Sequence, residues 1–326
     1  MPNTLTRRSL GAGAAALALI GSGARAQGAY PNKPIRLILP LSAGSTVDIL
    51  TRKLSDALST ALGQPLVIEN NPGAGGVVGT AQIARADKDG YTLGMVSSNH
   101  VVVPHVIKDV SWNATRDFTP ISVVAGSGLA LVVNAESPYR TAQELIAAAR
   151  ARPGDITYGS SGNGTILHLA SVLFAKEAGI DLKHVPYKGV APMVNDLLGN
   201  VIQCVITSSA SVQSHVAAGR LRILAVSTRK REPSLPNIPS LAEVGLVNYD
   251  YAAWIAMIGP ADLPAAVVER LQTALKTVLG KPDTKEALDK LGLSIIGSDA
   301  ATAKTFFESE LTKHGDLVRL SGAKAE

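Results

Sequence analysis

Short aliphatic runs alternate with amphipathic helical patterns along most of this chain. The aliphatic runs predict strands at 35–40, 66–69, 91–96, 121–125, 129–134, 156–158, 183–185, 202–206, 221–227 and 252–258. Apolar positions three and four residues apart predict helices at 47–62, 76–86, 141–152, 166–179, 190–199, 210–218, 239–245, 264–279, 283–291 and 300–320. Because such alternation is typical of parallel sheets covered by helices, we predict an α/β fold.

The number of predicted strands favours two α/β domains over one. The segment 121–133 predicts two strands joined by a flexible Gly-Ser-Gly hinge, and 249–259 is a second long apolar segment. If the chain crosses between domains at these two places, domain I comprises 27–127 plus 251–326. Domain II then comprises 128–250, and a ligand cleft lies between the two domains.

The N-terminus predicts a secretory signal peptide over residues 1–26. Arg7 and Arg8 precede an apolar run at 10–20, and Ala24-Arg25-Ala26 is an A-x-A cleavage site. The paired arginines also fit a twin-arginine signal, so the Sec and twin-arginine routes both remain open. The apolar run is too short to span a bilayer. We therefore expect a periplasmic protein that is cleaved after Ala26.

Charge and composition narrow the classes of partner. Loss of residues 1–26 lowers the formal net charge from +5 to +2, no block of Lys and Arg remains, and aromatic residues make up 4% of the chain. These features exclude nucleic acid as the expected partner. The single cysteine, Cys204, lies in a predicted buried strand and excludes an internal disulfide framework. No pair of histidines has zinc-site spacing, so we expect neither a metal nor a cofactor.

Two loops of small residues separate a predicted strand from a predicted helix. Such loops leave the first N–H groups of the helix open, and together with the helix dipole these donors favour an anion. One loop lies in each predicted domain, which indicates a cleft that closes on a carboxylate. The residues expected to bind the ligand are Leu41, Ala43, Gly44, Ser45, Thr46, Ser97, Ser98, Asn99, Ser160, Ser161, Gly162, Thr165, His168 and Thr207.

Each of these segments also has a purely structural interpretation. Ser45 or Thr46 with Asp48 forms a capping arrangement, which by itself would only stabilise the start of a helix. The segment 97–99 is an ordinary polar turn when considered alone. His168 shares a helix face with Thr165, so it either supports that residue or contacts the ligand.

Sequence motifs for enzymes are incomplete in this chain. The glycines at 73, 75 and 79 are one residue off the dinucleotide fingerprint, and no P-loop follows them. The segment 159–163 misses the nucleophile elbow because it ends in Asn163. A serine hydrolase that uses Ser160 or Ser161 remains a distant alternative, since no base is placed by the sequence to activate either serine. We expect no enzymatic activity.

The mature chain resembles the Bug family of extracytoplasmic solute receptors, which are the substrate-binding proteins of tripartite tricarboxylate transporters. The matching motifs occur in register at 30–36, 72–76, 89–93, 160–165 with His168, 184–189, 196–199, 217–222, 225–227 and 236–240. The resemblance implies a fold like periplasmic binding protein type II, with two domains joined by two crossover segments. It also implies that the first strand–helix loop and the Ser-Ser-Gly loop hold a carboxylate through backbone and hydroxyl donors.

The chain departs from the family pattern at two places. Leu41 and Ala43 stand where the family usually has an aromatic residue and a proline, and Ser45 replaces a glycine. Thr207 and the two serines after it stand where an acid or amide is frequent. Because an acid there would recognise an ammonium group, its absence favours plain or aromatic carboxylates over amino acids.

We therefore expect a monomeric receptor that captures a small organic carboxylate and delivers it to the membrane permease subunits of its transporter. Presentation of the same ligand to a sensor kinase is the alternative that the sequence leaves open.

Overall fold

A computed structural model describes residues 30–323 of the chain. The predicted signal peptide, 1–26, lies outside the described residues. None of the described helices is both long and apolar enough to cross a membrane.

The strands and helices follow the predicted alternation in most places. The strands are β1 (Ile35–Leu39), β2 (Leu66–Asn70), β3 (Thr92–Ser97), β4 (Phe118–Asn134), β5 (Thr157–Ser160), β6 (Lys183–Pro186), β7 (Cys204–Ser208), β8 (Leu221–Val226), β9 (Ala252–Pro260) and β10 (Ser294–Ile295). The helices are α1 (Thr46–Leu62), α2 (Val77–Ala84), α3 (Asn99–Val106), α4 (Ala142–Ala151), α5 (Ile166–Ala178), α6 (Val190–Leu198), α7 (Ser209–Ala217), α8 (Ala265–Leu279), α9 (Pro282–Lys290) and α10 (Ala300–Ser321).

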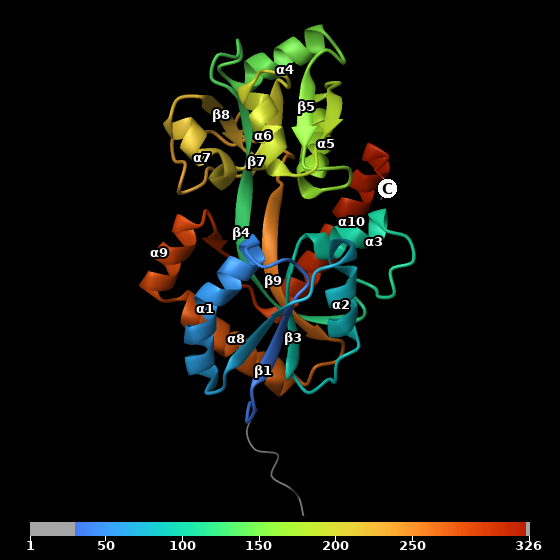
Figure 1. The fold of residues 1–326 in the computed structure, drawn as a ribbon, viewed down its shortest axis with the longest axis vertical. Helices are drawn as coiled ribbons and strands as arrows, with labels where there is room; N and C mark the ends of the chain where they lie inside the picture. The colour runs from blue at the N-terminus through green and yellow to red at the C-terminus, as the bar shows by residue number, and fades with distance from the viewer. Residues whose placement is uncertain (1–29, 324–326) are drawn as a thin grey trace, which may run out of the picture.

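Two lobes lie end to end along the long axis of the molecule (Figure 1). We call lobe I the part built on strands β2-β1-β3-β9-β4, with β10 added beside β4. Lobe II is built on strands β4, β7, β5 and β6, with β8 also paired to β4. Strand β4 therefore belongs to both sheets and joins the lobes.

The sheets are mixed, which corrects the expectation of parallel sheets. β1 is parallel to β2 and β3, and β5 is parallel to β6 and β7. In contrast, β9 is antiparallel to β3 and β4, and β4 is also antiparallel to β7 and β8. Because β4 and β9 are buried along most of their length, they appear in the sequence as continuous apolar runs, as parallel strands do.

The predicted hinge at residues 126–128 is wrong. β4 is one continuous strand of 17 residues rather than two strands joined by a flexible loop. Gly126 lies opposite Trp254 and Gly128 opposite Ala252, so pairing with β9 holds the glycines extended. Hydrogen bonding along the neighbouring strand outweighs the conformational freedom of glycine here.

Separate hydrophobic clusters fill the two lobes. In lobe I, Leu37 of β1 packs with Leu50 of α1 on one face of the sheet, while Ile38 packs with Ile83 of α2 on the other. This follows from the alternation of side chains along a strand. The core of lobe II surrounds Phe174 of α5.

The C-terminal helix α10 contacts both lobes. Phe307 near its start is buried in the core of lobe I, and Leu317 and Val318 near its end are buried in the core of lobe II. Figure 1 shows α10 (red) rising beside α3 toward α5. The helix therefore forms a further link between the lobes, in addition to the crossing strands.

One other predicted element is wrong, and two observed elements were not predicted. The expected helix at 239–245 is a set of turns, because only five residues separate Pro239 from Gly245, whose φ is +110°. Helix α3 was not predicted, since the consecutive valines at 101–103 and Pro104 are poor helix formers. Burial of those valines stabilises the helix. The two-residue strand β10 was also not predicted.

Candidate functional site

A cavity of about 340 Å³ lies between the lobes. Its wall is formed by Leu41, Ser45, Thr46, Val47, Ser97, Ser98, Ser127, Leu129, Ser161, Ile166, Leu167, Val190, Thr207, Ser208, Ala210, Ser211, Ala253, Trp254, Ile255, Leu291 and Leu293. Both lobes and both crossing strands contribute to this wall. The cavity occupies the position at which the sequence predicts a ligand cleft.

Five helices begin at this cavity. The first residues of α1, α5 and α6 (Thr46, Ile166 and Val190) lie in its wall, as do the N-cap residues of α3 and α7 (Ser98 and Ser208). The first N–H groups of a helix have no acceptor within the helix, and the helix dipole adds partial positive charge. The cavity is therefore surrounded by donors suited to an anion.

The side chains of the wall are hydroxyl-bearing or apolar. None of the described residues that line the cavity carries a charge or a side-chain amide. In the part of the chain that the structure describes, no group of three or more His, Cys, Asp or Glu residues could hold a metal ion. An anion in this cavity would thus be stabilised by hydroxyl and backbone donors.

The loop before α1 is fixed by a cap, as the sequence predicts. Ser45 is the N-cap, and its Oγ accepts from the N–H of Asp48 at 3.3 Å. The Asp48 carboxylate accepts from the N–H of Gly44 at 2.9 Å, and Gly44 has φ +79°. Burial alone would raise the pKa of Asp48, but the bonds from Gly44, Asn70 and Arg52 lower it. The loop is therefore held by an ionised carboxylate that is not among the residues lining the cavity.

Ser160 has a histidine partner, which corrects the expectation that no base lies near this serine. His184 Nε2 lies 2.7 Å from Ser160 Oγ. The contact arises because β5 and β6 are neighbouring parallel strands, with Tyr158 opposite His184. Ser160 Oγ also lies 3.1 Å from the carbonyl oxygen of Gly162, and Ser160 is fully buried. Ser160 Oγ accepts from the N–H of Gly162 at 3.2 Å, and its own hydrogen goes to the Gly162 carbonyl or to His184 according to the tautomer of that histidine. In both cases these bonds hold the loop in place.

His168 lies under the same loop. Its Nδ1 accepts from the N–H of Gly164 at 3.1 Å, and its ring stacks on His184 with centroids 4.0 Å apart. Burial, together with the nearby His184, lowers the pKa of His168 to about 4. The ring is therefore neutral near pH 7 and supports the loop from beneath.

The structure divides the predicted site residues into two groups. Those in the cavity wall are Leu41, Ser45, Thr46, Ser97, Ser98, Ser161 and Thr207. Those outside it are Ala43, Gly44, Asn99, Ser160, Gly162, Thr165 and His168. Thr165 caps α5, and Asn99 lines a small adjoining void. A role in ligand contact stays a prediction for every member of both groups.

Two-thirds of the wall residues were not predicted from the sequence. Ser208 and Ser211 follow Thr207 in one polar segment of the sequence. Extending the predicted site along that segment would have included both residues. The residues of β9, together with Leu291 and Leu293, belong to no motif and reach the cavity only through the fold. No signal in the sequence identifies them.

Comparison of the sequence with known proteins identifies a family of solute receptors. A family model described as tripartite tricarboxylate transporter family receptor matches residues 50–322. A protein from the tcbD-tcbE intergenic region of Pseudomonas sp. (strain P51) is 36% identical over 93% of this chain and 91% of its own length. BugT of Bordetella pertussis is 32% identical, covering 90% of this chain and 91% of its own length.

Solved structures show the same fold. R. palustris Rpa4515 with adipate has a TM-score of 0.76 and 30% identity over 90% of this chain and 99% of its own. A TctC solute binding protein from Polaromonas has a TM-score of 0.80 and 27% identity over 89% of this chain and 99% of its own. The chain therefore belongs to the family of tripartite tricarboxylate transporter receptors, which are solute-binding proteins.

Proposed function

We propose that this receptor captures a small organic carboxylate between its lobes and delivers it to the membrane permease subunits of its transporter. The observation that carries the proposal is the convergence of five helix starts on a cavity whose described wall has no charged side chain. Rpa4515, which is 30% identical, was solved with adipate, a carboxylate. The donors around the cavity fit the same class of ligand.

We further propose the domain boundaries that the sequence predicts, 27–127 plus 251–326 and 128–250. The separate hydrophobic clusters support this division, although Leu317 and Val318 at the end of α10 pack in the core of lobe II. Leu129, one residue after the proposed boundary, already packs in the core of lobe II. Ligand binding is then a hinge motion that brings the two domains together around the cavity.

The receptor acts without catalysis in this proposal. Ser160 is fully buried and lies outside the cavity wall, and Ser161 donates to Thr165 Oγ1 at 3.2 Å. Neither serine is therefore presented to a substrate with a free base beside it. A serine-directed fluorophosphonate should leave the protein unlabelled, and labelling at Ser160 or Ser161 would favour a hydrolase instead.

We also propose that the chain is exported to the periplasm and works as a monomer. The basis is the signal pattern of residues 1–26. N-terminal sequencing of periplasmic protein should begin at Gln27, and light scattering should give the mass of one chain.

A thermal-shift screen of the protein that begins at Gln27 tests the binding function. The panel comprises small mono- and dicarboxylates, aromatic acids and amino acids. A ligand at a hundred times its dissociation constant stabilises the folded state by ~2.7 kcal/mol. For a chain of this size, that free energy raises the Tm by roughly 5 °C. Shifts with carboxylates but not with aspartate or glutamate are expected, and no shift with any acid would refute the function.

A further inference from the structure

Most hydroxyl groups on the lobe II side of the cavity are already bonded within the protein. Ser161 Oγ donates to Thr165 Oγ1 at 3.2 Å. Ser211 Oγ donates to the carbonyl of Ser208 at 2.7 Å and lies 3.1 Å from Thr207 Oγ1. The hydrogens of Ser161 and Ser211 are thus used by neighbouring protein atoms.

Lobe I offers hydroxyl groups that are still free. Ser98 is 1% exposed, lines the cavity, and has no hydrogen-bond partner for its Oγ. Ser45 Oγ accepts from the N–H of Asp48, which leaves its own hydrogen available. A buried hydroxyl without a partner is costly, so Ser98 indicates an acceptor that a ligand supplies. The start of α1, at Thr46, adds backbone donors beside these hydroxyls.

The end of the cavity near α9 is apolar. Leu291 and Leu293, which follow α9, line it together with Ile255 of β9. Lobe II closes over this end, because a Cβ placed on Gly292 would lie 3.7 Å from the Cβ of Ala210 in α7. Figure 1 shows α9 and α3 on opposite sides of the crossing strands, so the end of the cavity next to α9 lies away from the end next to α3.

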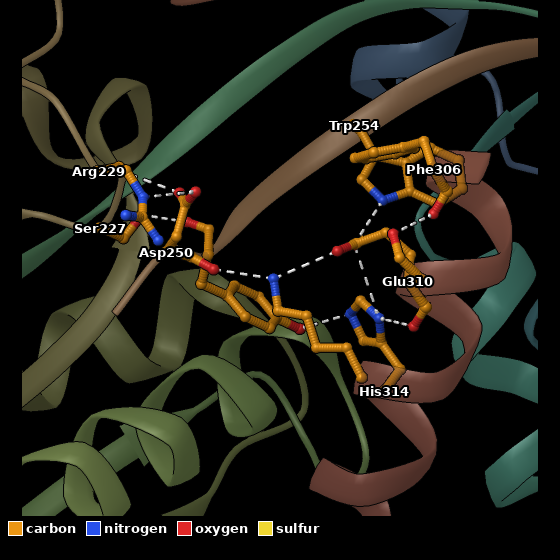
Figure 2. Close-up of polar contacts among 10 residues, drawn as sticks. Ser227, Arg229, Asp250, Trp254, Phe306, Glu310 and His314 are labelled. Atoms are coloured by element: carbon orange, nitrogen blue, oxygen red, sulfur yellow. Dashed lines mark hydrogen bonds and ion pairs between the residues drawn. The ribbon is translucent and has the colours of Figure 1, made fainter. Parts of the chain in front are cut away.

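Trp254 adds apolar surface and no donor. Its indole N–H donates to Glu310 Oε2 at 2.9 Å, and Figure 2 shows this bond leading away to α10. The Glu310 carboxylate also accepts from Lys313 Nζ at 3.2 Å. Because the N–H is committed to Glu310, Trp254 presents only ring carbons to the cavity.

We infer that this cavity selects an acid with a single carboxylate and an apolar body. The carboxylate lies at Ser98, Ser45 and the start of α1, and the body extends toward Leu291 and Leu293. A second carboxylate at the leucine end would lie against Leu291, Leu293 and Ile255, with neither a cation nor a buried unpaired hydroxyl such as that of Ser98 among the described residues there, which is unfavourable. The inference rests on the proposed carboxylate-binding function and adds the ligand class to it.

Two matched pairs of acids test this ligand class by titration calorimetry with the protein that begins at Gln27. Hexanoate and adipate share a six-carbon chain, and benzoate and terephthalate share a ring. We expect the better monoacid to bind at least tenfold more tightly than its diacid. A diacid that binds as tightly as its monoacid overturns the inference and leaves the receptor function intact.

If none of the four acids binds, the result of the thermal-shift panel distinguishes two further outcomes. If another acid of the thermal-shift panel binds, the ligand class is wrong and the carboxylate receptor stands. If no acid of that panel binds, the proposed function and this inference both fail.

Two variants test the placement of the ligand. Ser98→Ala should weaken binding of the monoacid about tenfold or more, because a hydrogen bond to a charged group is lost. Ser122→Ala is the matched control, since Ser122 is a buried serine of β4 that is bonded to the Val123 carbonyl and lies outside the cavity wall. Equal affinities of the two variants would overturn the placement.

Leu291→Arg tests the other end by a gain of binding. A cation there gives a second carboxylate its partner, so the diacid should gain affinity relative to the monoacid. Leu291 is only partly buried, so the change is compatible with folding. An unchanged ratio of the two affinities would show that the ligand does not extend toward Leu291.

Discussion

At the scale of single residues, neutral aromatic side chains support the Ser-Ser-Gly loop. The rings of Tyr158, His184 and His168 form a stack, with centroids 4.8 Å apart in the first pair and 4.0 Å in the second. Burial lowers the pKa of both histidines, to about 4 for His168. A proton on either ring would place a charge in a buried stack, so acid should weaken the support of this loop.

The sign of the pH effect follows from His168. In the unfolded chain, a histidine titrates near pH 6.5, whereas His168 in the folded protein titrates at about 4. Protons therefore bind the unfolded state first, and stability is full above pH 6.5 and falls as the pH drops toward 4. Between pH 7.5 and pH 5, we expect His168 to account for ~1–2 kcal/mol of lost unfolding free energy.

Urea unfolding at the two pH values checks this prediction. His168→Gln retains a side-chain oxygen as an acceptor for the N–H of Gly164 but takes up no proton. The variant should lose less stability than the wild type between pH 7.5 and pH 5. An identical loss in both proteins would mean that His168 does not carry the effect.

Ser45 combines a structural and a functional role, which a matched pair of variants separates. Ser45→Ala removes the cap of α1, and Thr141→Ala removes the equivalent cap of α4, where Thr141 Oγ1 accepts from Glu144 N at 3.2 Å. Each change should cost ~1 kcal/mol of stability. Only Ser45→Ala should also weaken carboxylate binding, because Thr141 lies outside the cavity wall. Equal affinities would assign Ser45 a capping role alone.

At the scale of elements, the sequence predicts those whose pattern is local. Helix α1 begins within one residue of the prediction, because its cap and its apolar spacing agree. β4 was predicted as two strands, because pairing with β9 decides the conformation of Gly126 and Gly128. Leu291 and Leu293 were not predicted as site residues for the same reason, since only tertiary contacts bring them to the cavity.

Close packing at β4 gives a prediction at the scale of this strand. A Cβ on Gly128 would overlap the Glu232 carboxylate, which is buried and whose pKa is raised by that burial. Gly128→Ala should therefore cost ~1–3 kcal/mol of unfolding free energy through overpacking. Gly126→Ala should cost less, because the nearest atom is the flexible end of Ile296, at 3.0 Å.

Rescue by a second change identifies the cause of this loss. The double variant Gly128→Ala with Glu232→Ala should recover part of the stability lost by Gly128→Ala, since it removes the overlapping carboxylate. Strictly additive losses in denaturant unfolding would rule out the overlap as the cause.

At the scale of the whole molecule, hydrogen bonds fasten the two crossing strands together. Ser227 Oγ accepts from the N–H of Leu129 on β4 at 2.7 Å and donates to the carbonyl of Tyr251, just before β9, at 2.5 Å. From α10, Lys313 donates to the carbonyl of Asp250 at 2.8 Å, and His314 bonds the Tyr251 hydroxyl at 3.0 Å (Figure 2). Opening of the cavity therefore has to bend a fastened pair of strands and shift α10.

The lobes also approach each other at two places. A Cβ on Gly164 would lie 2.8 Å from Val106 Cγ1 of α3, and a Cβ on Gly292 would lie 3.7 Å from the Cβ of Ala210 in α7. Because both lobes form the cavity wall, we expect ligand exchange to require the lobes to separate. A covalent link between Gly292 and Ala210 would prevent that separation.

A disulfide between Gly292→Cys and Ala210→Cys tests this requirement. The distance of 3.7 Å between the two Cβ positions falls within the range of disulfides. Oxidation should slow both association and dissociation of the bound carboxylate in stopped-flow measurements, and reduction should restore both rates. Gly292 has φ +68°, so the cysteine there is strained, but the oxidised and reduced forms share that strain. The two single-cysteine variants should respond to neither treatment. Unchanged exchange in the linked protein would mean that ligand enters without separation of the lobes at this end.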